Sequence, residues 1–276
     1  MSQTLAGALA GMVNGATAWM KPYRRAMTRT LVANRLTQRV AVATPGGALY
    51  IEAASGRSLH YPDRLYEDEP ETIRWLDALP PADNLWDIGA NIGIFALYAA
   101  RARGMRVLAF EPGAASHAAL VRNIEINSLG DRIDAFCLAF DTAERLDYLQ
   151  MANTEAGHPL HVFGAERAAR PGVRPHFRQS VPAFAIDRFC ALFRPPPPHH
   201  IKLDVDGIEL DILKGGAATI AAHARSLLVE IEADAAGRAI RAFLAGLDFS
   251  EDAAFAAQGA RRNVLFRRVA QNGGDR

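Results

Sequence analysis

Short apolar runs alternate with amphipathic stretches along most of the chain. Runs typical of buried strands lie at 85–88, 106–110, 133–138, 201–205 and 226–232. Stretches with helical spacing of apolar residues follow them, at 92–103, 114–128, 184–192, 209–213 and 235–247. Buried strands that alternate with helices predict an α/β domain with a mostly parallel sheet.

The first 36 residues have a helical pattern of their own. Apolar side chains recur at three- and four-residue spacings from Leu5 to Met20, and a basic turn begins at Lys21. One interpretation is a helix that contacts a membrane surface or a partner. The other is a helix that packs over the following domain, or a half-ordered terminus. The many alanines and glycines on the apolar face favour the second.

Further segments flank the central pattern on both sides. Residues 39–51 predict a β-hairpin around Pro45-Gly46-Gly47, and 61–68 predict a polar loop. An amphipathic helix is expected over 71–79, and 249–255 with 263–269 are expected to form a closing hairpin. We divide the chain into an extension (1–60), a main domain (61–270) and a tail (271–276).

Residues 142–183 have the weakest pattern. Strands are expected at 146–151 and 177–183, with a loop rich in His, Arg, Gly and Pro between them. A loop of this length in a compact domain is usually functional or disordered. We expect it at the ligand end of the sheet, where it would shape the choice of substrate.

A glycine-containing turn follows the first buried strand, in Asp87-Ile-Gly-Ala-Asn-Ile-Gly93. Gly89 allows a sharp turn, Gly93 allows close approach of a ligand or the next strand, and Asn91 tolerates the left-handed region. The spacing fits neither a dinucleotide loop nor a P-loop. An acid two residues before the first glycine suits a ligand with a positive end, such as the amino group of S-adenosylmethionine. We therefore expect Asp87, Gly89, Ala90, Asn91 and Gly93 to bind this cofactor.

The next two strands each end in an acidic residue. Glu111 lies 22 residues beyond Gly89 and precedes Pro112; an acid at this place in a Rossmann-like unit binds ribose hydroxyls. Phe140 and Asp141 follow the third strand, where an adenine ring would lie. Phe140 would cover the ring and Asp141 would accept from its amino group, although Asp141 also suits a plain turn or N-cap.

A second group of charged residues occupies Lys202-Leu-Asp-Val-Asp-Gly-Ile-Glu209. Alternation along a strand places Lys202, Asp204 and Asp206 on one face, with Glu209 in the first turn of the next helix. A lysine in a central strand is costly to bury unless it is paired. Glu230 is the expected partner if its strand is the neighbour.

His199 and His200 precede this strand and therefore lie at its amino end. Ligands of open parallel sheets bind outside the carboxyl ends of the strands. We expect no metal site at this pair.

Composition limits the classes of protein that remain. At 276 residues, one large domain with an N-terminal appendage is expected, and a net charge of +1 argues against a nucleic-acid partner. Cys137 and Cys190 lie in apolar contexts and suit a reducing compartment without disulfides. No run is apolar enough to span a bilayer, and Lys21 follows the first apolar stretch, unlike in a secretory signal. We expect a cytoplasmic protein.

The ordered set of motifs resembles the FkbM-type family of S-adenosylmethionine-dependent methyltransferases over residues 60–235. It comprises Asp87–Gly93, Phe110–Pro112, Asn123 with Asn127, Ile186-Asp187, Ile201–Glu209 and Glu230. The resemblance implies a class I methyltransferase (Rossmann-like) fold, with a mostly parallel seven-stranded sheet, one antiparallel edge strand and helices on both faces. It also implies O-methylation of a hydroxyl on a sugar, glycan or natural-product acceptor. The family usually has glutamate where this chain has Asp206.

A sugar hydroxyl is a poor nucleophile until its proton leaves, and this suggests a hypothesis for the roles of the charged group. Asp204 or Asp206 would take the acceptor's proton or align its hydroxyl, Lys202 would fix the carboxylates, and Glu209 would hold the substrate. In the alternative, the carboxylates bind Mg²⁺, which lowers the pKa of the hydroxyl; we favour the mechanism without metal. A nicotinamide-dependent oxidoreductase would need the missing glycine spacing. A non-catalytic S-adenosylmethionine-binding or scaffold protein of the same fold stays open, and the sequence carries no sign of an oligomeric state.

Overall fold

The computed structural model describes residues 2–52, 55–56, 58–158, 161–164, 175–259 and 262–269. These residues belong to two compact units, Met1–Arg39 and Val40–Arg276. The predicted tail and most of the loop between 158 and 175 lie outside the described residues. Our division at 60 and 270 stays a prediction.

The first unit is a helical hairpin of α1 (Ser2–Ala16) and α2 (Pro22–Leu36). The predicted helix over 1–36 is therefore interrupted. Pro22 stands in the first turn of α2, where its missing N–H is not needed, and its ring prevents the first helix from continuing through it. The Thr17 hydroxyl donates to the carbonyl of Val13 at 2.7 Å, at the end of α1.

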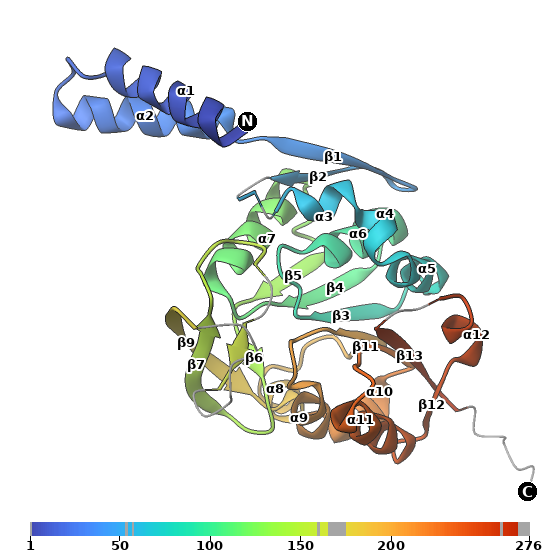
Figure 1. Ribbon diagram of the computed structural model, residues 1–276. Helices are drawn as coiled ribbons and strands as arrows, with labels where there is room; N and C mark the ends of the chain where they lie inside the picture. Colours follow the sequence, from blue (N-terminus) through green and yellow to red (C-terminus); the bar gives the residue numbers. More distant parts are fainter. Residues whose placement is uncertain are drawn as a thin grey trace, which may run out of the picture. The chain divides into compact units, whose positions relative to one another are not determined.

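The second unit is built on a seven-stranded sheet, in the order β12-β13-β11-β10-β3-β4-β5 (Figure 1). The strands are β3 (Asn84–Ile88), β4 (Arg106–Phe110), β5 (Ile133–Phe136), β10 (His200–Leu203), β11 (Ser226–Glu230), β12 (Phe249–Glu251) and β13 (Asn263–Arg268). The sheet is mostly parallel, as predicted, and β13 runs antiparallel to β11 and β12. The antiparallel strand thus lies second from the edge, not at the edge where we expected it.

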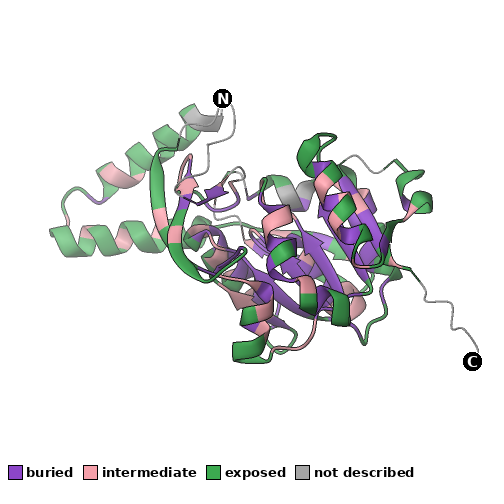
Figure 2. Cartoon of the chain, turned by 90° about the horizontal axis from the view of Figure 1, so that it is seen from below, coloured by how far each residue is buried: buried purple, intermediate pink, exposed green. Residues whose placement is uncertain are grey.

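Alternation along the strands supplies two apolar cores, one on each face of the sheet. Leu85 and Val107 belong to one core, and their neighbours Trp86 and Leu108 belong to the other. The first core packs against α5 (Pro70–Ala78), α6 (Ile94–Arg103) and α7 (Ala114–Ile126). The second packs against α8 (Ile186–Phe193), α9 (Glu209–Gly215), α10 (Ala217–His223) and α11 (Ala235–Ala245). Figure 2 shows these buried strands between helices whose outer surfaces are exposed.

Two smaller sheets accompany the main one. The predicted hairpin is present as β1 (Arg39–Thr44) and β2 (Gly47–Glu52). The weakly patterned segment supplies most of a four-stranded sheet in the order β6-β9-β7-β8. Its strands are β6 (Ala139–Phe140), which precedes the segment, β7 (Arg145–Met151), β8 (Val162–Phe163) and β9 (Phe177–Phe184). The two strands that we predicted in it pair antiparallel along their whole lengths.

Two local predictions were wrong. The expected polar loop at 61–68 is two short helices, α3 (His60–Asp63) and α4 (Leu65–Asp68). The expected strand at 249–255 ends at Glu251 and is followed by α12 (Ala253–Ala256), which Asp252 caps by accepting from the amide of Phe255. Four-residue helices are too short to show a periodicity, so the apolar pattern gave no sign of them.

Candidate functional site

The strand order reverses between β3 and β10, and a cavity of about 430 Å³ lies at their carboxyl ends. In open α/β sheets this is where ligands bind. The described lining comes from the turn after β3, the ends of β4, β10 and β11, and the four-stranded sheet. Nine of the predicted site residues line it: Gly89, Ala90, Asn91, Glu111, Pro112, Phe140, Lys202, Asp204 and Asp206.

The turn after β3 depends on three left-handed residues. Gly89, Asn91 and Gly93 have φ of 87°, 51° and 90°. A Cβ on Gly89 would lie 1.9 Å from the Asp204 carbonyl oxygen, so the chain after β10 approaches the turn closely. A Cβ on Gly93 would meet the side chain of Leu120 at 2.3 Å. Gly93 therefore makes room for helix α7, and its predicted contact with the cofactor stays a prediction.

Replacing Gly89 with alanine is expected to lower the free energy of unfolding by about 2–4 kcal/mol, because it adds an unfavourable φ and a clash with backbone. Gly130→Ala is the matched control, since a Cβ there meets nothing within 4 Å. Urea titration of both variants measures the difference. Equal stabilities would show that the turn does not need the contact with Asp204.

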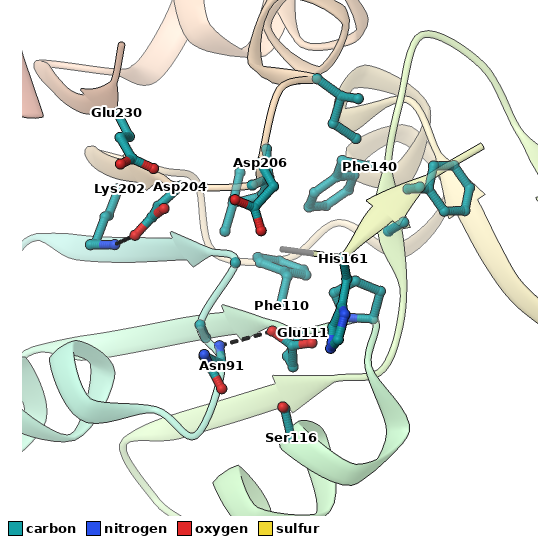
Figure 3. Close-up of a pocket in the computed structure, with 18 of the residues that line it drawn as sticks. Asn91, Phe110, Glu111, Ser116, Phe140, His161, Lys202, Asp204, Asp206 and Glu230 are labelled. Atoms are coloured by element: carbon teal, nitrogen blue, oxygen red, sulfur yellow. Dashed lines mark hydrogen bonds and ion pairs between the residues drawn. The ribbon is translucent and has the colours of Figure 1, made fainter. Parts of the chain in front are cut away.

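Glu111 is buried beneath the turn at the end of β4. Its Oε2 accepts from the Asn91 amide at 2.9 Å (Figure 3). Its Oε1 accepts from the Gly113 amide at 2.7 Å. Burial raises the pKa of Glu111 to about 7, against the lowering effect of these two hydrogen bonds. The carboxylate is thus fixed in place by the backbone while it lines the cavity.

Phe140 and Asp141 separate in the structure. Phe140 lines the cavity and stacks on Trp86, with ring centroids 6.1 Å apart. Asp141 is fully buried outside the described lining. Its Oδ1 accepts from the Thr142 amide at 2.7 Å, and its Oδ2 pairs with Arg145 at 2.6 Å. Its carboxylate therefore holds the start of β7, and the predicted contact with adenine has no support.

Lys202 is 2% exposed and lies among acidic side chains. Its Nζ donates to Asp204 Oδ2 at 2.6 Å and lies 4.8 Å from the centre of the Phe95 ring. Burial by itself lowers the pKa of Lys202, but the charges of Asp204, Glu69 and Asp87 outweigh it, and the pKa is raised. The side chain is a permanent cation that orients Asp204.

Asp204 and Asp206 follow the strand instead of continuing it. β10 ends at Leu203, so these residues do not share a strand face with Lys202 as we predicted. Asp206 has φ of 53° and Gly207 has φ of 105°. Aspartate tolerates this left-handed conformation better than most side chains, which is a backbone reason for the aspartate at this position.

Glu230 lies at the end of β11, beside β10, as we expected from its strand. It was predicted to pair with Lys202, yet the hydrogen bond of Lys202 goes to Asp204. Burial, the charge of Asp204 and a hydrogen bond with Asp204 raise the pKa of Glu230 to about 7. Arg262 is 3.5 Å from its Oε1. Figure 3 shows Glu230, Asp204 and Asp206 on the same side of the cavity, across from Glu111.

Asp87, Gly93, Asp141 and Glu209 lie outside the described lining. Glu209 accepts from the Gly207 amide at 3.0 Å and stabilises the turn after Asp206. Asp87 is buried behind the glycine turn, and burial raises its pKa to about 6, opposed by Lys202. Both residues therefore lie next to lining residues without lining the cavity themselves.

Several lining residues were not predicted: Glu69, Phe95, Ser116, His158, His161 and Arg262. Glu69 precedes α5 and accepts from the Thr72 hydroxyl at 2.8 Å and from Asn263 at 3.1 Å. His158 and His161 stack with ring centroids 5.7 Å apart. In the sequence, only their three-residue spacing in a loop rich in histidine could have marked these two residues as part of the site.

The described residues contain no group of three or more His, Cys, Asp or Glu side chains arranged to hold a metal ion. At the amino end of β10, His200 Nε2 lies 3.0 Å from Asp83 Oδ2 and its Nδ1 lies 2.8 Å from the Ser226 hydroxyl. His200 is therefore hydrogen-bonded in a buried network. It lies at the amino end of the strand, opposite the end where the cavity lies, as its sequence position predicted.

The fold is that of a Rossmann-like α/β protein, with a cavity at the carboxyl ends of its central strands. The model of the methyltransferase FkbM domain matches residues 87–252. This match covers more than half of the chain, so the chain belongs to the FkbM methyltransferase family, as the motifs predicted. Membership of this family supports the interpretation that the protein is a methyltransferase. No curated protein matches the chain.

Three solved structures are similar to parts of this chain. The methyltransferase FkbM from Methylobacillus flagellatus KT is 17% identical with a TM-score of 0.44, and the match covers 68% of this chain and 44% of that one. A protein of the NADB-Rossmann superfamily from Streptococcus agalactiae is 13% identical with a TM-score of 0.41, over 72% and 67% of the two chains. TYW2 of P. horikoshii in complex with MeSAdo is 22% identical with a TM-score of 0.28, over 37% and 36%.

Proposed function

We propose that this protein is an S-adenosylmethionine-dependent methyltransferase that methylates a hydroxyl of a sugar, glycan or natural-product acceptor. One observation carries the proposal. A single cavity joins the glycine turn and Glu111 to the carboxylates that surround the buried Lys202. A nucleotide site and a set of proton acceptors thus share one space.

The residues at the Glu111 end suit S-adenosylmethionine. Glu111 can accept from two adjacent ribose hydroxyls while the backbone amides hold it in place. Phe110, Leu138 and Phe140 supply an apolar wall against which an adenine ring can pack. When bound, the cofactor supplies an electrophilic methyl group on a cationic sulfur. The carboxylates of Asp204, Asp206 and Glu230 favour a positive charge at the other end of the cavity.

The acceptor end must remove a proton, since a neutral hydroxyl is a poor nucleophile. Asp204 or Asp206 takes this proton. Lys202 fixes the position of Asp204 and balances the negative charges around it. If these carboxylates instead bind Mg²⁺, incubation with EDTA will abolish the activity and added Mg²⁺ will restore it.

Two measurements test the proposal. Calorimetry with S-adenosylmethionine and with NAD measures cofactor choice, and transfer of a labelled methyl group to a panel of hydroxyl acceptors measures the reaction. We expect binding of S-adenosylmethionine only, and transfer to at least one acceptor. Binding without any transfer would favour the non-catalytic alternative, and binding of NAD alone would contradict the proposal.

The rate is expected to rise between about pH 6 and pH 8. Below pH 7 Glu230 keeps its proton and shares a hydrogen bond with Asp204, which then accepts less readily from the substrate. As Glu230 ionises, its charge makes Asp204 more basic. The pH profile of kcat measures this step, and Glu230→Gln should remove it. An unchanged profile in the variant would assign the step to another group.

A further inference from the structure

The helical hairpin of residues 2–36 exposes apolar side chains along both of its helices. The exposed ones are Leu5, Leu9, Met12, Tyr23, Met27, Leu31 and Leu36, together with Trp19 in the turn. Spacings of three and four residues place Leu5, Leu9 and Met12 on one stripe of α1, and Tyr23, Met27 and Leu31 on one stripe of α2. Other residues, such as Val13 and Thr17, are the less exposed ones within the hairpin.

The charge of this unit is of one sign. Residues 1–39 contain six basic residues and no acidic one: Lys21, Arg24, Arg25, Arg29, Arg35 and Arg39. With 25 basic and 30 acidic residues, the rest of the chain carries a net charge of −5. Helix α1 has no charged residue, so the basic side chains concentrate in the turn and along α2.

Aromatic and basic residues meet at the turn between the helices. Trp19 is 80% exposed and Tyr23 is 75% exposed, with Lys21 between them and Arg24 next in the chain. Aromatic rings with one polar edge are enriched at the boundary between lipid tails and headgroups. Lysine and arginine at the same level pair with anionic headgroups.

We propose that this hairpin binds the surface of a membrane that contains anionic lipids. The apolar stripes enter the boundary between headgroups and tails, and the basic residues contact the lipid phosphates. Among the described residues, no helix is long and apolar enough to cross a membrane. A nucleic acid would use the basic residues but would leave the apolar stripes and the uncharged α1 without a role. The proposal concerns this unit alone and does not depend on the proposed activity.

The full chain mixed with vesicles provides a direct test. Phosphatidylcholine vesicles are compared with vesicles that also contain phosphatidylglycerol, by co-sedimentation and by tryptophan fluorescence. Trp19 is the reporter, because Trp75 and Trp86 are 1% and 0% exposed. We expect binding to the anionic vesicles only, with a blue shift of the emission that Trp19→Phe removes. Absence of binding, or binding with unchanged Trp19 emission, would overturn the proposal.

Charge variants separate the hairpin from the rest of the surface. Lys21, Arg24 and Arg29 replaced together by glutamine should weaken binding by at least about tenfold, since each basic residue near an anionic surface contributes. The matched control replaces Arg106, Arg122 and Arg241, three partly exposed arginines of the other unit, by glutamine as well. The control should bind as the wild type does. The proposal fails if the control variant loses as much vesicle affinity as the hairpin variant, or if the hairpin variant keeps full affinity. It also fails if the wild-type chain binds nucleic acid but not the anionic vesicles.

Discussion

Glu111→Gln is expected to weaken the binding of S-adenosylmethionine by about a hundredfold, because two charge-assisted hydrogen bonds to ribose hydroxyls become neutral ones. The change keeps the size of the side chain. One amide oxygen still accepts from the Asn91 or the Gly113 amide, while the new NH₂ group opposes the other donor. Isothermal titration of both proteins measures the dissociation constants.

The pH dependence of binding identifies the charge of Glu111 as the cause. The pKa of Glu111 is raised to about 7 by burial, so the wild type should bind more tightly as the pH rises through this value. The glutamine variant should lose this dependence. Glu125→Gln, an exposed change on α7, is the control and should bind as the wild type does. If Glu111→Gln binds S-adenosylmethionine with wild-type affinity, another residue must bind the ribose hydroxyls.

The sequence predicted the parts of this protein that depend on neighbouring residues. The glycine turn could be placed because Gly89, Asn91 and Gly93 must adopt left-handed conformations within five residues of one strand end. Glu111 could be placed because the strand that carries it is bounded by a glycine turn and a proline. Both features are local, and the parallel sheet brings them together without further information.

The lining residues that the sequence did not predict reach the cavity through contacts that only the folded chain creates. Glu69 and Arg262 lie outside the matched domain of 87–252, and they reach the cavity through α5 and the loop before β13. The ion pair with Arg145 also directs the Asp141 carboxylate away from the cavity. The sequence could not predict this pair, since either residue alone suits many turns. The end of β10 was placed two residues too late, because the left-handed turn at Asp206-Gly207 interrupts a run that looks like a continuous strand.

Asp204→Asn and Asp206→Asn are expected to identify the proton acceptor, and the variant that removes it should lose about a hundred- to ten-thousandfold in kcat. The structure distinguishes the two residues. Asp204 is held by Lys202 and shares a hydrogen bond with Glu230, so its basicity is set by its neighbours. Asp206 lies on a left-handed turn, where asparagine is equally tolerated, so its substitution should leave the backbone unchanged.

Cofactor binding and stability must be measured beside kcat, because Asp204→Asn also leaves Lys202 with one anionic partner fewer. Glu69 and Asp87 still surround that cation, so we expect the variant to fold and to bind S-adenosylmethionine. A large loss of kcat with unchanged affinity for the cofactor then assigns proton transfer to Asp204. The same pattern in Asp206→Asn would assign it to Asp206, with Asp204 and Lys202 as its electrostatic support. If both variants keep near-normal rates, neither carboxylate takes the proton, and the acceptor's hydroxyl must be activated by another group in the cavity.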